Sequence, residues 1–301
     1  DGDVDHGPAS PFALMDFEKD EGKTLTCCAR PSSDVTIEAD IDVPDELVVH
    51  PVEDYVGTIV ALDEIAKDTM RLVVTLDRPM GFNAGQYMRF QIPGHPGVDR
   101  TWSIASAPTS PQTLEFQISN VPGGVGTAGW LFSSAEVGDH VPMSGPYGRF
   151  VLRTWEDKPV VMLASGTGLA PLASMVRHAL LNGEYDGHIT LYAGARTPEE
   201  LYDVEAFRGL EEEFADRFTY HPCVSGDAVE GFRHGRVNEV MESDFDRLGG
   251  HQGYICGSPA MVESSLKSMM GKRLFPRDIF HEDFFNEGDK VAGVGSPLIK
   301  R

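Results

Sequence analysis

The pattern of apolar residues changes near Arg153, and this change constrains the fold more than any other feature of the sequence. From Tyr55 onward, short stretches of alternating apolar and polar residues are separated by turns rich in glycine and proline. After Arg153, short continuous apolar runs alternate with segments of helical periodicity. The first pattern is typical of an antiparallel barrel or sandwich, and the second of a doubly wound parallel sheet. The sequence therefore predicts two unlike domains.

The first pattern predicts six strands and one helix, and the second predicts four strands and four helices. The strands expected in the first domain are 56–62, 70–76, 87–92, 101–106, 114–119 and 140–143, with a helix over 126–133. The strands expected in the second are 159–164, 188–193, 218–224 and 252–256, with helices over 171–182, 198–215, 235–241 and 259–270.

A length of 301 residues is enough for two such domains with cores of their own. We place the barrel domain at residues 55–153 and the parallel-sheet domain at 154–301. Residues 43–54 have two prolines and no clean periodicity, which indicates a linker. Upstream of it, residues 1–42 are expected to include a short helix near 11–18 and a strand over 35–40.

The charge and composition exclude several classes of partner. The formal net charge of −22 repels DNA, RNA and anionic lipid, and no apolar run reaches the roughly 20 residues of a membrane span. An acidic surface serves solubility or docks a positively charged protein, and charge alone does not decide between these. Four cysteines form no disulfide framework, and the acidic start differs from a secretory signal, so a cytoplasmic location is expected.

A glycine-rich turn follows the first apolar run of the second domain. It reads Gly166-Thr167-Gly168-Leu169-Ala170-Pro171, and Pro171 suits the first turn of a helix. Glycines here let the backbone approach a pyrophosphate, and the helix start offers free N–H groups with a partial positive charge. The pattern is G-x-G-x-x-P rather than the fingerprint G-x-G-x-x-G, so a plain strand-to-helix turn is the alternative interpretation.

Two further segments carry candidate ligand-binding residues. Along one expected strand, Arg100 and Trp102 share a face and Thr101 and Ser103 share the other, which offers a charge, an aromatic plane and hydroxyls. Cys256 ends another expected strand, where an α/β sheet places ligand-facing residues. The alternatives are a half-buried strand for the first segment and a small buried residue for the cysteine.

These segments together resemble the ferredoxin–NADP reductase type of flavoprotein, specifically the reductase components of bacterial multicomponent oxygenases, over about residues 52–301. The FAD-binding R-x-Y-S motif of that family corresponds to residues 100–103, with Trp102 in place of Tyr. The resemblance implies that Arg100 holds the FAD pyrophosphate, that Trp102 lies against flavin or ribose, and that Ser103 hydrogen-bonds near flavin N5. Residues 122–127 resemble the second phosphate motif. The implied FAD-binding residues of the barrel are Arg100, Thr101, Trp102, Ser103, Gly124, Gly126 and Thr127.

The second domain resembles the nicotinamide dinucleotide domain of the same family. Residues 256–259 resemble its C-G-x-P motif, in which the thiol lies beside the nicotinamide. Residues 280–285 resemble the segment that closes over the flavin. The resemblance implies that Ser103, Cys256 and Glu282 tune the transfer of hydride. The remaining implied cofactor-binding residues are Gly166, Thr167, Gly168, Pro171, Arg196, Gly257, Pro259, Phe284 and Phe285.

The coenzyme expected is NADH rather than NADPH. Residues 192–197 and 201–203 resemble NADH-using oxygenase reductases. An NADPH enzyme needs cationic groups near the ribose 2′-phosphate. Arg196 is close in sequence and Arg208 lies further along, but four acidic residues crowd the same region: Glu199, Glu200, Asp203 and Glu205.

Residues 22–38 resemble the end of a plant-type [2Fe–2S] ferredoxin domain, an α+β fold, and Cys27 falls on the fourth cluster ligand. The C-x₄-C-x₂-C motif that supplies the other three ligands is absent from these 301 residues. We therefore expect residues 1–42 to be the C-terminal part of such a domain, with the [2Fe–2S] cluster bound by the full-length protein and not by this chain alone.

The resemblance implies an NADH:acceptor oxidoreductase in which hydride passes from NADH to FAD, and single electrons pass through [2Fe–2S] to a di-iron hydroxylase. One alternative is a stand-alone NAD(P)H-dependent flavin or ferredoxin reductase without its own cluster. Another is a non-catalytic scaffold subunit, against which the intact motif residues Arg100, Ser103, Gly166 and Gly168 argue.

Overall fold

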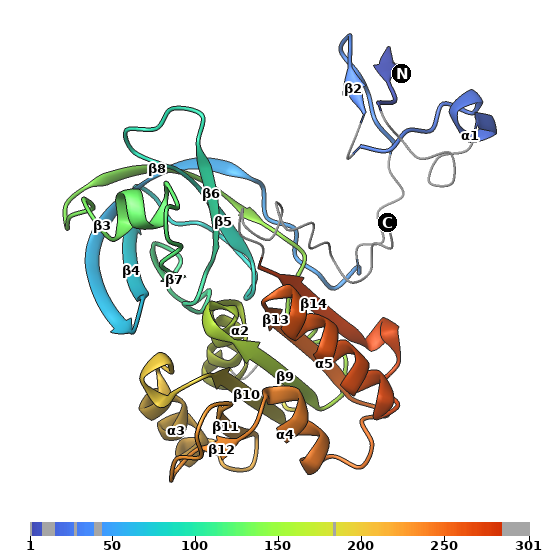
Figure 1. Cartoon of the computed structure of the whole chain (residues 1–301). Helices are drawn as coiled ribbons and strands as arrows, with labels where there is room; N and C mark the ends of the chain where they lie inside the picture. Colours follow the sequence, from blue (N-terminus) through green and yellow to red (C-terminus); the bar gives the residue numbers. More distant parts are fainter. Residues whose placement is uncertain (1, 8–15, 27–28, 39–43, 183–184, 285–301) are drawn as a thin grey trace. The chain divides into compact units, whose positions relative to one another are not determined.

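The computed structural model describes residues 2–7, 16–26, 29–38, 44–182 and 185–284 and consists of two compact units, Asp1–Leu47 and Val48–Arg301 (Figure 1). In the first unit, strands β1 (Val4–Asp5) and β2 (Arg30–Pro31) pair antiparallel, and helix α1 spans Asp16–Asp20. The expected strand over 35–40 is wrong for residues 35–38, which pair with no strand in the described part of this unit. Cys27 lies outside the described residues.

The second unit begins with a six-stranded antiparallel barrel. Its strands are β3 (Glu53–Ala66), β4 (Thr69–Leu76), β5 (Tyr87–Gln91), β6 (Asp99–Ser103), β7 (Thr113–Ser119) and β8 (His140–Tyr147). They are hydrogen-bonded in the order β6-β5-β8-β3-β4-β7. A bridge between Ile104 and Phe116 joins the two outer strands and closes the sheet on itself. A single turn of π-helix, η1 (Thr127–Leu131), replaces the expected helix over 126–133.

Alternation along these strands explains the barrel core. In β4, Leu72, Val74 and Leu76 are buried, because successive side chains of a strand point to opposite faces. The same alternation buries Met88 and Phe90 of β5. These side chains form one apolar cluster that fills the barrel and supports its outer residues.

The rest of the second unit is an α/β domain with a six-stranded parallel sheet. Its strands are β9 (Val160–Ser165), β10 (Ile189–Ala195), β11 (Phe218–Val224), β12 (Arg233–His234), β13 (Gln252–Gly257) and β14 (Ile279–Asp283). Its helices are α2 (Leu169–Asn182), α3 (Val204–Glu213), α4 (Val237–Asp244) and α5 (Pro259–Gly271), with 3₁₀ turns η2 (Gly166–Gly168), η3 (Pro198–Glu200) and η4 (Pro276–Asp278).

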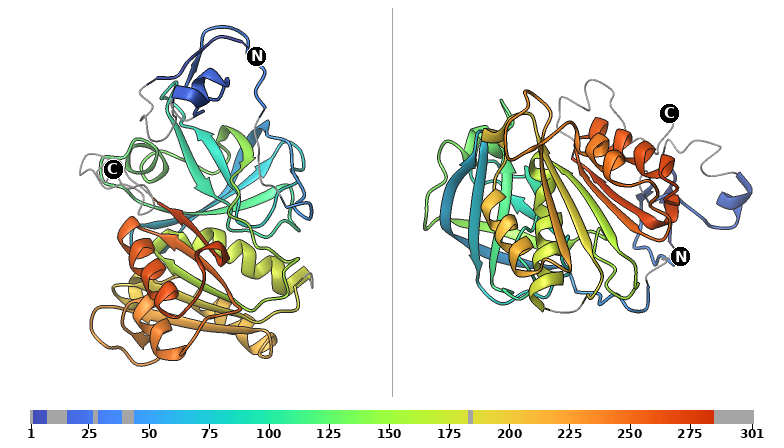
Figure 2. Two further views of the ribbon diagram at one scale, coloured as in Figure 1. Left: turned by 90° about the vertical axis from the view of Figure 1, so that its right-hand side faces the viewer. Right: turned by 90° about the horizontal axis from the view of Figure 1, so that it is seen from below.

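Helices cover both faces of this sheet, as Figure 2 shows from below. Val176 of α2 and Phe207 of α3 belong to the apolar cluster on one face, and Met241 of α4 and Val262 of α5 belong to the cluster on the other. The strand order is β12-β11-β10-β9-β13-β14. The order therefore reverses between β9 and β13, which is where doubly wound sheets bind their ligands. The expected fold class of both domains is confirmed.

Two local differences from the sequence-based expectation matter for the site. The expected helix over 198–215 is divided into η3 and α3, because residues 201–203 leave the helical conformation and Asp203 has a left-handed backbone with φ of 56°. Strand β14 was not expected, since three of its five residues, His281, Glu282 and Asp283, are polar or charged.

Candidate active site

A cavity of about 580 Å³ opens at the carboxyl ends of the parallel strands. Among the residues that line it, Ser165 ends β9, Ala195 ends β10, and Ser258 directly follows β13. Helices α2, α4 and α5 begin at this same edge, so their free N–H groups add partial positive charge there. The cavity therefore lies at the reversal of strand order, where a dinucleotide is expected to bind.

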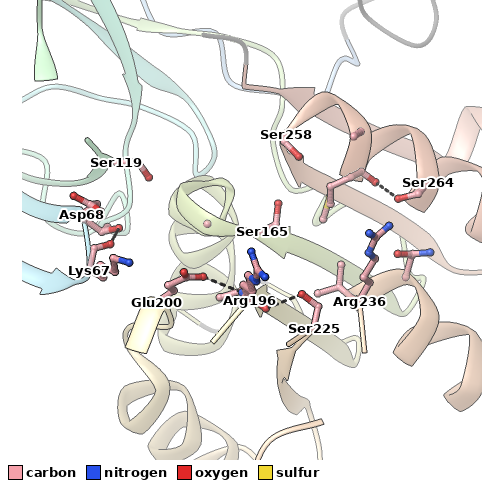
Figure 3. A pocket seen from close by; sticks show the side chains of 18 of the residues that line it. Lys67, Asp68, Ser119, Ser165, Arg196, Glu200, Ser225, Arg236, Ser258 and Ser264 are labelled. Carbon is pink, nitrogen blue, oxygen red and sulfur yellow. Dashed lines mark hydrogen bonds between the residues drawn. The ribbon is translucent and has the colours of Figure 1, made fainter. Parts of the chain in front are cut away.

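Residues of the barrel complete the cavity, as Figure 3 shows. Lys67 and Asp68 come from the turn between β3 and β4, and Ser119 ends β7. Three basic side chains line the cavity, Lys67, Arg196 and Arg236, against two acidic ones, Asp68 and Glu200. A chain with a net charge of −22 thus concentrates basic groups at one cavity, which suits an anionic ligand such as a pyrophosphate.

The glycine loop packs directly on the strand across the reversal point. A Cβ on Gly168 would lie 2.1 Å from the carbonyl oxygen of Cys256, so this close approach of two backbones requires glycine. Gly166 lines the cavity, and Thr167 accepts a 3.3 Å hydrogen bond from the hydroxyl of Ser119 on the barrel. The loop is therefore held between β13 and β7.

The expected FAD-binding strand, residues 100–103, is β6. Arg100 is half-buried and its Nη1 donates to the carbonyl of Asp99 at 2.7 Å. Trp102 packs against Phe90, with ring centroids 4.6 Å apart, and stacks on Trp130 at 6.3 Å. The tryptophan is thus anchored on the barrel core and half-buried, whereas Thr101 is exposed.

The loop over residues 122–127 lies beside this strand. A Cβ on Gly126 would lie 2.7 Å from Cγ of Arg100, so the two expected phosphate-binding segments touch. The hydroxyl of Thr127 donates to the carbonyl of Val121 at 3.2 Å and accepts from its N–H at 3.1 Å. Thr127 therefore closes the loop, and a Cβ on Gly124 would lie 2.7 Å from this same hydroxyl.

The three residues expected to tune hydride transfer are linked through a tyrosine that the sequence did not single out. Ser103 is buried and pairs across the sheet with Tyr87. Burial raises the pKa of Tyr87, and the nearby charge of Glu282 raises this pKa further. Glu282 on β14 pairs in turn with Cys256 on β13. The barrel and the parallel sheet thus bring these residues to one region.

Burial controls the chemistry of Glu282 and Cys256. The carboxyl of Glu282 has a pKa raised to about 7, first by burial and then by the charge of Asp283. Its Oε2 is enclosed and has no hydrogen-bond partner within the described ranges. Burial also raises the pKa of the Cys256 thiol well above its ordinary value, so the thiol is neutral. Cys256 packs in the apolar cluster beneath α2 and does not line the cavity.

Several expected cofactor-binding residues shape the backbone around the site. Pro171 and Pro259 are buried in the first turns of α2 and α5. The N–H of Phe284 donates to the carbonyl of Gly257 at 2.8 Å, which fixes the end of β14 beside the reversal point. Phe285 lies outside the described residues.

The comparisons with known proteins agree with this geometry. Residues 57–152 match the oxidoreductase FAD-binding domain and residues 162–267 match the oxidoreductase NAD-binding domain. The chain is 42% identical to the phenol 2-monooxygenase reductase component DmpP of Pseudomonas sp. (strain CF600), over all of this chain and 86% of the relative. It is 32% identical to the propane 2-monooxygenase reductase component of Rhodococcus jostii (strain RHA1), over 94% of this chain and 78% of the relative.

A solved structure is similar to this chain in both fold and sequence. The Amycolatopsis cytochrome P450 reductase GcoB has a TM-score of 0.84 and 36% identity, and the match covers 94% of this chain and 85% of that chain. The chain belongs to the reductase components of multicomponent oxygenases. The reductase has an FAD-binding barrel and an NAD-binding α/β domain, and it transfers electrons from NAD(P)H through FAD.

Sequence reasoning missed several residues that line the cavity of the reductase. Arg236 and Ser225 lie 40 and 29 residues beyond Arg196 and come from neighbouring strand ends. Lys67 and Ser119 come from the other domain. The signal for Arg236 was available, because Gly235 and Arg236 open the helix expected over 235–241, but the signal for the barrel residues was not.

In the described parts of the reductase, no helix combines the length and apolar character that crossing a membrane requires. Nor do these parts contain a group of three or more His, Cys, Asp or Glu side chains that could hold a metal ion.

Proposed function

We propose that this reductase takes hydride from NADH onto FAD and delivers single electrons through a [2Fe–2S] cluster to a di-iron hydroxylase. The observation that carries the proposal is the cavity itself, which lies at the reversal of strand order and is lined from both the FAD-binding barrel and the NAD-binding domain. Its excess of basic side chains supports a pyrophosphate ligand.

The residues of β6 and the 122–127 loop fit FAD, because Gly126 leaves room for a phosphate-binding surface directly beside Arg100. FAD, when bound, accepts hydride from the nicotinamide and releases the electrons singly. Within this proposal, Arg100 holds the pyrophosphate and Trp102 offers its exposed side to the flavin or ribose. Ser103 presents its hydroxyl near flavin N5, and the parallel-sheet domain holds the nicotinamide in place and excludes water.

We favour NADH because Glu200 lines the cavity and its Oε2 accepts a 3.0 Å hydrogen bond from the N–H of Arg196. A carboxylate at this position suits a ribose 2′-hydroxyl and opposes a 2′-phosphate. Two guanidinium groups, those of Arg196 and Arg236, line the same cavity, so the preference for NADH is expected to be modest. The ratio of kcat/KM for NADH and NADPH measures it.

The proposed cluster and partner rest on different support. Residues 22–38 resemble the end of a ferredoxin domain, with Cys27 as a cluster ligand in the full-length protein. The relatives named above are reductase components of a phenol and a propane monooxygenase, which supports a hydroxylase as the electron acceptor. Cysteines without a disulfide framework support a cytoplasmic location.

Anaerobic stopped-flow reduction of the FAD-loaded protein by NADH tests the first half of the proposal, with bleaching of the flavin as the expected result. Iron and acid-labile sulfide analysis of the full-length protein tests the second half. A flavin that NADH does not bleach contradicts the hydride step. Finding neither iron nor sulfide, together with full activity toward external acceptors, favours a stand-alone flavin or ferredoxin reductase instead.

A further inference from the structure

The boundary between the barrel and the α/β domain carries a compact cluster of opposite charges. Arg71 of β4 and Glu115 and Gln117 of β7 come from the barrel. Arg177 of α2 and Asp203, which precedes α3, come from the other domain. The four charged side chains are between 8% and 27% exposed, and two positive charges face two negative ones.

Asp203 is the centre of this cluster. Its Oδ1 accepts from Arg71, and its Oδ2 accepts from Arg177 at 3.0 Å and from Gln117 at 2.9 Å. Glu115 lies 3.4 Å from Nε of Arg71 and 3.3 Å from Nη1 of Arg177. The two arginines thus bridge a carboxylate on each domain, and planar guanidinium groups fix both distance and direction.

The cluster continues along β7 to the glycine loop. Side chains two apart on a strand point the same way, so Glu115, Gln117 and Ser119 form one row. The first two join the cluster, while Ser119 donates to Thr167 in the loop. The position of the loop over the barrel is therefore tied to the same row of side chains as the cluster.

A second connection runs through the neighbour of Asp203. Tyr202 is 5% exposed, and its hydroxyl donates to the carbonyl of Gly166 at 3.1 Å. Gly166 lines the coenzyme cavity. Because Tyr202 and Asp203 are consecutive, a shift of Asp203 against its arginines is passed directly to the first residue of the loop.

We infer that the cluster of Arg71, Glu115, Arg177 and Asp203 positions the glycine loop relative to the FAD-binding barrel and so sets the rate of hydride transfer. The apolar contact between the domains, in which Ile65 of β3 packs against the core beneath α2, is non-directional and does not fix this geometry. Asp203 is a positioning residue in this inference, which rests on the proposed transfer of hydride from NADH to FAD.

The test uses the FAD-loaded chain with Asp203→Asn, which keeps the shape of the side chain and removes its charge. We expect the limiting rate of flavin reduction by NADH to fall by about 100-fold, the effect of a misplacement near 1 Å, while the Kd for NADH changes little. A primary isotope effect with 4-deuterated NADH should rise as hydride transfer becomes limiting. Without coenzyme, the amides of residues 166–169 should exchange hydrogen faster than in the wild type.

Asp203→Glu is expected to recover much of the rate because it restores the charge. Arg78→Met is the matched control: it removes an arginine from the same barrel, 46% exposed and paired with Glu53 and Asp77, and should leave both rate and exchange unchanged. If Asp203→Asn does not fold, Arg71→Met carries the same test.

Wild-type rates and wild-type exchange in the FAD-loaded variant would overturn the inference, as would a loss of stability and FAD content with no change in the limiting rate. A wild-type protein that NADH does not reduce would instead contradict the proposed function. The two failures are therefore distinguishable.

Discussion

Two carboxylates at the same domain boundary have opposite surroundings. Asp203 is met by two guanidinium groups and the amide of Gln117. Glu282 is enclosed beside Asp283, and its Oε2 has no hydrogen-bond partner in the described part of the chain. The carboxylate of Asp203 holds its two arginine neighbours in place, whereas the enclosed carboxyl of Glu282, whose pKa is raised to about 7, exchanges a proton near neutral pH. The comparison indicates that the Asp203 side of the boundary fixes the geometry, whereas the Glu282 side is able to gain or lose a proton.

The largest effect is expected from Asp203→Ala, which leaves Arg71 and Arg177 without a shared partner. Removing one member of a largely buried ion pair costs about 3 kcal/mol of the free energy of unfolding. Urea denaturation of the variant and wild type measures this cost. Glu205→Ala is the control, since Glu205 is 85% exposed and pairs with Arg208 at the surface, where a pair contributes about 0.5 kcal/mol. Equal losses in the two variants would contradict the contrast drawn above.

Glu282→Gln tests the other carboxylate through pH. The pKa of Glu282 is about 7 in the folded chain and 4.5 ordinarily, so the wild type loses stability as pH rises from about 4.5 through 7. The amide does not ionise, and the variant should therefore be more stable than the wild type at pH 8, by at most about 3 kcal/mol. At pH 4 the two should be alike. A stability difference that is the same at both pH values would rule out the burial of charge as its cause.

Ser103→Ala tests whether the Ser103 hydroxyl, on the Glu282 side of the boundary, contributes to flavin reduction. Loss of one hydrogen bond near the reacting atoms should slow flavin reduction by about tenfold, because such a bond contributes about 1 to 2 kcal/mol. FAD should remain bound, since Arg100 and the 122–127 loop are unchanged. Stopped-flow reduction and flavin absorbance measure the two properties, and Ser110→Ala, in an exposed turn, serves as the control. An unchanged reduction rate would show that Ser103 has no part in the step.

The smallest effect concerns a third carboxylate, Glu200, which is neither enclosed nor shared between arginines. Glu200→Gln should raise kcat/KM for NADPH relative to NADH by about fivefold, the effect of a partly exposed charge contact near 1 kcal/mol. The amide oxygen is still able to accept from Arg196, so the loop should keep its shape. Steady-state rates with both coenzymes provide the measurement. Glu199→Gln is the control, because Glu199 is exposed and does not line the cavity.

Apolar periodicity predicted most of the fold, because a strand or helix turns side chains toward the core at a fixed spacing, and those positions are apolar. The alternation at residues 70–76 became β4, and the apolar run at 159–164 became β9. Strand β14 was missed, since Glu282 and Asp283 are partly buried charged residues that a pattern of apolar residues does not reveal. The break before α3 was missed as well, because it depends on the left-handed backbone of Asp203.

The candidate site was predictable where its residues are consecutive and not where they meet by folding. Gly166, Thr167 and Gly168 were found as one turn. Asp203, in contrast, was counted among the acidic groups that oppose NADPH, whereas folding brings it to Arg71, which lies 132 residues earlier in the chain. An ion pair between residues far apart in the chain leaves no pattern in the local sequence. Both the partner and the role of Asp203 therefore came from the structure.

The distribution of charge has a consequence for how the coenzyme reaches its cavity. NADH approaches as an anion toward a chain of net charge −22 and meets Lys67, Arg196 and Arg236 only at the end of its path. The repulsion acts over a long range and the attraction over a short one. Salt near 0.1 M, with a Debye length of about 10 Å, weakens the distant charges first. Moderate salt should therefore speed the encounter of the coenzyme with the protein. The net negative charge repels every anion at long range, and only an anion that reaches the cavity is attracted by its basic side chains.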